Sequence, residues 1–99
     1  MSKPIKNIQL FNNLCAIEET LISRGWCQDR IIDDAGRVCI MGAVVNVVPY
    51  DKDWCILVEA IESAIPTALP VTGFNDDPAT TFDDVLGVIR KAREALVAS

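Results

Sequence analysis

Histidine is absent from this chain of 99 residues. The chain therefore lacks the side chain that most often acts as a general base near neutral pH and most often binds a metal ion. It also cannot form the Ser–His or Cys–His pairs that activate many nucleophiles. An enzyme with this sequence would have to use carboxylates, lysine, tyrosine or an unassisted thiolate. We therefore identify no catalytic residue, and a non-enzymatic role is favoured.

Basic side chains are in the minority. Nine Lys and Arg stand against 14 Asp and Glu, which gives a net charge of -5. A protein that binds a phosphate backbone needs a basic stripe to displace counterions, so we expect no nucleic-acid partner. The same charge is compatible with an acidic surface that meets a basic protein partner.

Long apolar runs are also missing. The first ten residues, MSKPIKNIQL, contain no apolar core of signal-peptide length. The longest apolar run, 38–49, is interrupted by Asn46 and is far shorter than the ~20 residues of a membrane span. We expect a cytoplasmic protein that makes no membrane contact.

The four cysteines do not form a recognisable site. No two of them have the CxxC spacing of zinc ribbons and redox dithiols, and a reducing cytoplasm favours free thiols. Cys15 and Cys55 lie among apolar residues at helical spacing, which predicts that both are buried. A zinc site built from all four, with Cys27 and Cys39, is the alternative. We predict no metal ligands and no cofactor.

The apolar content of 51% is enough for one compact core, and the length fits a single small globular domain over residues 1–99. Residues 1–7 are expected to form a flexible N-terminal arm. Apolar residues recur mainly with helical period, which predicts a mainly α fold, a compact bundle of about four helices. The helices are expected at about 8–24, from 39 to before Pro49, from a cap at Asp51 or Asp53 to about 65, and at about 82–96.

Capping residues mark several helix ends. Asn7 is a suitable N-cap for the first helix, and Gly25 suits a left-handed C-terminal cap. Thr81 begins the last helix with an acid three positions further on, a variant of the capping box. Asp76, Asp77, Asp83 and Asp84 near the start of that helix, and Arg90, Lys91 and Arg93 near its end, complement its dipole.

The stretch between the first two helices lacks helical periodicity. Asp33-Asp34-Ala35-Gly36 predicts a turn, and the residues on either side, 31–32 and 37–38, are expected to pair as a short hairpin. Asp29 adds a third acid, but the ligand spacing of a calcium loop is missing, so a solvated turn is favoured. Trp26 is expected to pack on the core, and Gly42-Ala43 should let another segment approach closely.

Proline and glycine predict an irregular segment from Pro66 to Pro78, with Val71 and Phe74 packed on the core. Asn75 and Asp76 are expected to make local side chain–backbone bonds there, as Asx residues before a helix commonly do. The alternative is contact with a ligand or a partner. Asn75, Asp76 and Cys39 are the residues that we nominate for such a contact.

Several short motifs occur together in a distinctive order. They are Gly25-Trp26, Asp34-Ala35-Gly36, Cys39-Ile40-Met41-Gly42-Ala43, Asn75-Asp76 and the stretch from Thr81 to Val85. In this order the chain resembles, over about residues 9–98, a bacterial and phage family known as domain of unknown function 6197. Phe74 stands where that family usually has a tryptophan. The resemblance implies a fold and brings no activity.

Three hypotheses for the function remain open. The first is a small helical accessory domain that binds a protein partner, and it is favoured by the missing histidine. The second is a ligand-binding domain or an enzyme that uses Asp76, Asp33 or Cys39 in a cleft near the Asn75-Asp76 loop. The third is an acidic nucleic-acid mimic, which ranks last because the acids fall at helix starts and turns.

Overall fold

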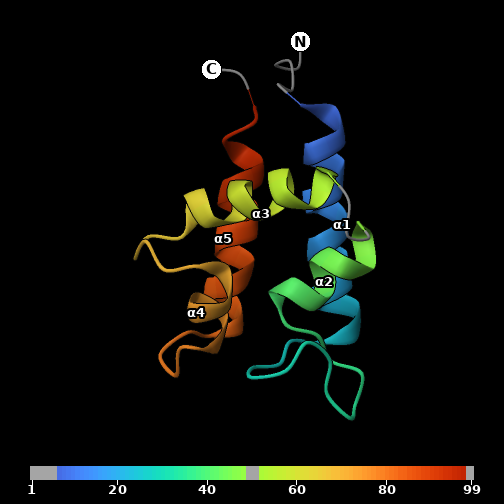
Figure 1. Ribbon diagram of the computed structural model, residues 1–99, viewed down its shortest axis with the longest axis vertical. Coiled ribbons are helices and arrows are strands. Elements are labelled where there is room, and N and C mark those ends of the chain that lie inside the picture. The colour runs from blue at the N-terminus through green and yellow to red at the C-terminus, as the bar shows by residue number, and fades with distance from the viewer. Residues whose placement is uncertain (1–6, 49–51, 98–99) are drawn as a thin grey trace.

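The computed structural model describes residues 7–48 and 52–97. These residues contain five helices: α1 (Ile8–Arg24), α2 (Ile40–Val47), α3 (Lys52–Ala64), α4 (Val71–Asp76) and α5 (Phe82–Glu94). Helices α1 and α5 run side by side, and α3 lies across them (Figure 1). The described part of the chain has no strand, although isolated bridges join Trp26 and Ile32 to Val38. The mainly α fold is therefore confirmed.

Helix α1 has both of its predicted caps. The Asn7 side-chain oxygen accepts a hydrogen bond from the Leu10 N–H at 3.0 Å, and Gly25, at φ +89°, donates its N–H to the Leu21 carbonyl. The remaining residues of the predicted N-terminal arm, 1–6, lie outside the described residues. Leu10, Leu14, Ile17 and Leu21 form the buried face of α1, while Ile22 is 57% exposed.

Helix α2 is seated against the loop that precedes it. A Cβ at Gly42 would lie 2.3 Å from the carbonyl oxygen of Ile31, so the predicted close approach is confirmed and its partner is a loop backbone. Ile40, Ala43 and Val44 are fully buried on the other side of the helix. The predicted loop at 49–51, including the possible cap Asp51, lies outside the described residues, and Asp53 falls within the first turn of α3.

Helix α4 was not expected, and it occupies the middle of the segment predicted to be irregular. Pro70 is its N-cap residue, a position where proline is tolerated because no helical N–H is lost. The helix buries Val71, Phe74 and Asn75. Tertiary burial therefore stabilises a six-residue helix whose local sequence predicts a break.

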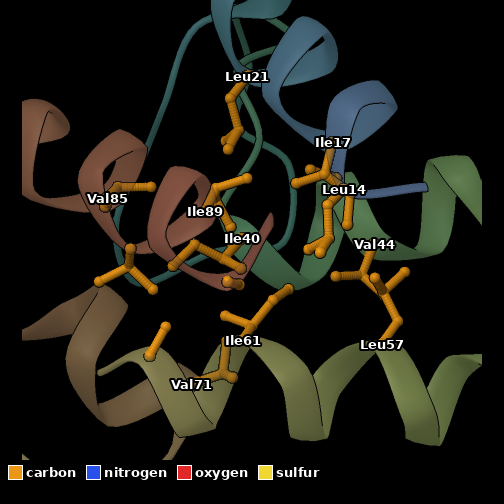
Figure 2. Packing of buried hydrophobic residues seen from close by; sticks show 14 of the residues in the cluster. Leu14, Ile17, Leu21, Ile40, Val44, Leu57, Ile61, Val71, Val85 and Ile89 are labelled. Atoms are coloured by element: carbon orange, nitrogen blue, oxygen red, sulfur yellow. The ribbon is translucent and has the colours of Figure 1, made fainter. Parts of the chain in front are cut away.

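The core draws on all five helices. Figure 2 shows the side chains of α1, α2, α3 and α5 meeting at its centre. Leu14, Ile17, Ile40, Ile61 and Ile89 are all 0% exposed. Each such side chain stabilises the fold by about 1.5–3 kcal/mol through its burial. None of the helices within 7–48 and 52–97 is long and apolar enough to cross a membrane.

One cluster of ion pairs links α1 and α5. Glu18 of α1 accepts hydrogen bonds from Arg90, at 2.9 Å, and from Arg93 of α5. Burial raises the pKa of Glu18, but the two arginines lower it by more, so the pKa lies below its ordinary value. Two of the three bases expected to complement the α5 dipole therefore also join α5 to α1.

Candidate functional site

The segment 25–39 leaves α1, turns, and returns to start α2. The Cys27 N–H donates to the Val38 carbonyl at 3.0 Å, and Ile32 forms an antiparallel bridge with Val38. The Asp33 N–H also donates to the Arg37 carbonyl at 2.9 Å. The predicted pairing is thus present as a short hairpin-like turn.

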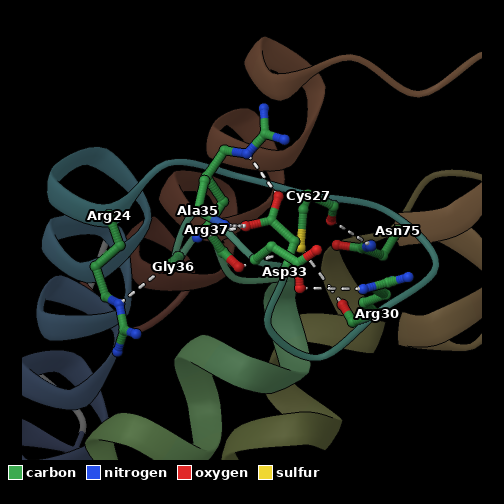
Figure 3. A network of polar contacts seen from close by, with 9 residues as sticks. Arg24, Cys27, Arg30, Asp33, Ala35, Gly36, Arg37 and Asn75 are labelled. Carbon is green, nitrogen blue, oxygen red and sulfur yellow. Dashed lines mark hydrogen bonds and ion pairs between the residues drawn. The ribbon is translucent and has the colours of Figure 1, made fainter.

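Asp33 organises this turn (Figure 3). One carboxylate oxygen accepts the N–H groups of Ala35 and Arg37, and the other pairs with the Arg37 guanidinium at 2.6 Å. Desolvation raises the pKa of Asp33, but the bonds from Arg37 and Ala35 outweigh it, so the pKa lies below the ordinary value. The described residues contain no cluster of three or more Cys, Asp or Glu side chains that could hold a metal ion.

Asn75 of α4 is the residue on which the segment 25–39 converges. Its amide oxygen accepts the Trp26 indole N–H at 2.8 Å and the Ile40 backbone N–H at 3.0 Å. Its amide nitrogen donates to the Cys27 carbonyl at 3.2 Å and to the Asp76 carboxylate at 2.8 Å. An asparagine side chain offers two donors and two acceptor sites, and all four are used. Three of the four partners lie 35 to 49 residues away, so the expectation of local bonds was wrong for Asn75.

Further bonds hold the end of α4 on the same segment. Asp76 accepts the backbone N–H of Asp29 at 2.9 Å. Gln28 donates to the carbonyls of Asn75, at 3.1 Å, and of Asp77, at 2.9 Å. Gln28 therefore caps the carbonyl end of α4, a role that local sequence gives no means of predicting.

The three nominated residues, Cys39, Asn75 and Asp76, line one pocket of about 270 Å³, together with Ile31 and Met41. Cys39 is buried, and its sulfur accepts the Gly42 N–H at 3.3 Å as the N-cap of α2. Asn75 and one Asp76 oxygen also make hydrogen bonds within the chain. The contribution of these bonds to stability is therefore enough to explain why Cys39, Asn75 and Asp76 occupy these positions. Their contact with a ligand or a partner stays a prediction.

The four cysteines are free thiols. Cys27 and Cys39 are buried, while Cys55 is exposed and Cys15 is half-buried. The predicted burial of Cys55 was therefore wrong, because it lies on the solvent side of α3. Burial raises the pKa of Cys27, and the nearby charge of Asp33 raises it further.

A second concavity lies between α5 and the chain from the end of α3 to the start of α5. We call it the α5 groove. Its volume is about 470 Å³. Ala64, Phe74 and Val88, each less than a tenth exposed, form its floor. Asp77, Asp83, Asp84 and Lys91 line it as well. The groove thus combines an apolar floor with charged edges.

Gly87 lies in this groove, in the middle of α5. A Cβ at this position would meet no atom within 4 Å, and the backbone is ordinary helix. Neither packing nor backbone conformation requires glycine here, and it costs about 1 kcal/mol in helix propensity relative to alanine. Gly87 was not among the residues nominated from the sequence. A glycine inside an otherwise well-formed helix was the signal that could have identified it.

The carboxylates at the groove have no basic partner among the side chains of residues 7–48 and 53–97. Asp84 accepts the Thr81 N–H as part of the capping box, and Asp77 accepts the Ala79 N–H. Lys91 lies two turns further along α5 and makes no ion pair within the same residues. The charges at the groove are therefore not neutralised by other side chains of the described chain.

The chain was compared with known protein families. The model of a family of unknown function (DUF6197) matches residues 12–95, a stretch that runs from the first turns of α1 to the end of α5. No curated protein and no solved structure matches the chain.

Proposed function

We propose that this chain, which belongs to the family of unknown function DUF6197, is a small helical domain that binds a partner protein through the α5 groove. The observation that carries the proposal is Gly87. A helix that keeps a glycine where an alanine would fit leaves its backbone accessible at the centre of an apolar concavity.

The arrangement of polar groups supports a protein partner over a small ligand. The floor residues Ala64, Phe74 and Val88 are apolar, and the charged groups stand at the edges. Protein–protein interfaces have this anatomy of an apolar centre and a polar rim. A small-molecule site instead places a few polar groups inside the pocket, where they fix the orientation of the ligand.

The shape of the groove supports the same conclusion. Its wall extends along α5 from Asp83 to Lys91. At a rise of 1.5 Å per residue this is about 12 Å, which suits a segment of another chain. The proposal includes a cytoplasmic location, since a reducing compartment keeps exposed thiols such as Cys55 free.

The proposal is tested by a substitution that fills the α5 groove with a large side chain. Gly87→Trp places a large side chain where a Cβ meets nothing, so the variant should fold. Asn12→Trp is the matched control, because Asn12 is an exposed, uncharged residue of α1 outside the groove.

Each full-length variant is immobilised and exposed to an extract of the native host, and the bound proteins are quantified by mass spectrometry. We expect one stoichiometric partner on the wild type and on Asn12→Trp, reduced at least about tenfold on Gly87→Trp. Equal recovery on Gly87→Trp, or a wild type that retains no stoichiometric partner, would contradict the proposal.

A further inference from the structure

We infer that the segment bound in the α5 groove is basic and amphipathic, with a lysine or arginine beside Asp77 and Asp83 and an apolar side chain over Gly87. This inference rests on the proposed function and names the chemistry of the partner. It follows from the charges at the groove, from their positions and from the floor between them.

Some acids of the described chain are paired with arginines. Glu18 is paired with Arg90 and Arg93, and Asp33 is paired with Arg37. Asp77, Asp83 and Asp84 have no such partner in the described residues. Exposed acids such as Glu19 and Glu59 are also unpaired, but Asp77, Asp83 and Asp84 line one groove together. A cationic side chain of a partner would complement these three carboxylates, and a carboxylate there would be repelled.

The positions of the charges define a direction. Asp83 and Asp84 lie in the first turn of α5, and Asp77 lines the same groove from the segment after α4. Lys91 lies about 10 Å further along α5, at the opposite end of the groove. A partner segment with its basic residue at one end only would fit the groove in one orientation, since a base beside Lys91 would be repelled.

The floor between the charged ends supplies the apolar contact. Phe74 and Val88 lie beneath the groove, and Gly87 leaves the helix backbone uncovered. An apolar side chain of the partner placed over Gly87 would remove both its own surface and the groove floor from water. The groove therefore favours a segment that presents basic and apolar residues on the same face.

The inference is tested with three 12-residue amphipathic peptides that share their leucine and alanine positions. One carries three lysines at its N-terminal end, the second three glutamines and the third three glutamates. Each is titrated into the full-length protein, and binding is followed through backbone amide chemical shifts at 50 mM and 300 mM salt. We expect the lysine peptide to bind about tenfold more tightly than the glutamine peptide at low salt, with its largest shifts at Thr80, Gly87 and Val88.

Charge variants separate the groove from the general acidity of the protein. Asp77→Asn combined with Asp83→Asn should weaken the lysine peptide about tenfold, or roughly threefold for each carboxylate, as expected for exposed ion pairs. Glu19→Gln combined with Glu59→Gln removes the same charge from exposed positions of α1 and α3 and should leave the affinity unchanged. Thermal unfolding of each variant confirms that it is folded.

Equal binding of the lysine and glutamine peptides, or equal weakening by both pairs of substitutions, would overturn the inference. These outcomes would not affect the proposed function, which is tested separately with Gly87→Trp. One result would contradict only the inference that the bound segment is basic. In that result Gly87→Trp no longer captures the native partner, but the variant with both Asp77→Asn and Asp83→Asn captures it in full.

Discussion

The indole N–H of Trp26 donates a hydrogen bond of 2.8 Å to the side-chain oxygen of Asn75, which lies 49 residues further along the chain. The same oxygen accepts the first N–H of α2, from Ile40. The Trp26 ring also stacks on Phe82 of α5, with ring centroids 6.0 Å apart. This pair therefore links the end of α1 to α2, α4 and α5.

Replacing Asn75 should destabilise the protein strongly. Asn75→Ala leaves the Trp26 indole, the Ile40 N–H and the Cys27 carbonyl without their partner, and each unsatisfied buried group costs about 1–3 kcal/mol. We expect the free energy of unfolding, measured by urea denaturation, to fall by about 3 kcal/mol or more.

Two further variants test the reason for this loss. Asn46→Ala removes an exposed asparagine and should change stability by less than about 0.5 kcal/mol. Trp26→Phe keeps an aromatic ring beside Phe82 but removes the indole N–H, so it should cost about 1 kcal/mol. If Asn75→Ala were no more damaging than Asn46→Ala, the role assigned to Asn75 would be wrong.

The same substitution at two glycines should have opposite effects. Gly42→Ala places a Cβ 2.3 Å from the Ile31 carbonyl oxygen, so the loop must shift, and we expect a loss of at least about 2 kcal/mol. Gly87→Ala meets no atom and should raise stability by up to about 1 kcal/mol through helix propensity. Thermal unfolding of both variants gives the comparison, and a stabilising Gly42→Ala would contradict the packing described here.

The Glu18 ion pairs predict a pH dependence. The pKa of Glu18 is lowered in the folded state relative to its ordinary value of 4.5, despite the opposing effect of burial. Its stabilising contribution is therefore complete above the unfolded pKa and is lost as the pH falls through the folded pKa. Glu18→Gln should cost about 1–3 kcal/mol at pH 7.

Urea denaturation of the wild type and Glu18→Gln between pH 7 and pH 2.5 measures this contribution. The difference in free energy of unfolding between the two proteins should be constant down to about pH 5 and should then decrease. Asp33, whose pKa is also lowered, titrates in both proteins and cancels in the difference. A difference that increases toward acidic pH would contradict the stabilising role of the Glu18 ion pairs.

The thiols should react with an alkylating reagent in the order of their exposure. Cys55 is exposed and should be modified first, and Cys15 should follow. Cys27 and Cys39 are buried, and burial also raises the pKa of the Cys27 thiol, so both should react last. Mass spectrometry after timed treatment with iodoacetamide gives the order. Modification of Cys39 ahead of Cys55 would instead identify Cys39 as a reactive thiol.

The sequence predicted the elements whose determinants are local. Asn7, Gly25 and the Thr81–Asp84 capping box act within one helical turn, so their residue types mark the helix ends directly. Gly42 predicted a close approach because it has no side chain, but its partner, the backbone of Ile31, has no local signal in the sequence. Helix α4 was missed because Gly73 and the flanking prolines disfavour a helix locally, whereas burial of Val71 and Phe74 and hydrogen bonds to distant residues stabilise it.

The candidate site was less accessible to sequence analysis. The nominated residues Cys39, Asn75 and Asp76 do line one pocket, but the bonds of Asn75 reach across the chain and have no local pattern. The α5 groove was not predicted. Its acids were explained by the helix dipole alone, and its floor is created by the packing of α4, which the sequence did not indicate.

The most direct test of the central claim is hydrogen–deuterium exchange of the full-length protein with and without its captured partner. We expect the partner to slow exchange within residues 77–91 and 64–67, which contribute the lining of the α5 groove, and to leave the exposed face of α1 unchanged. Protection confined to α1, or to the segment 25–39, would contradict it.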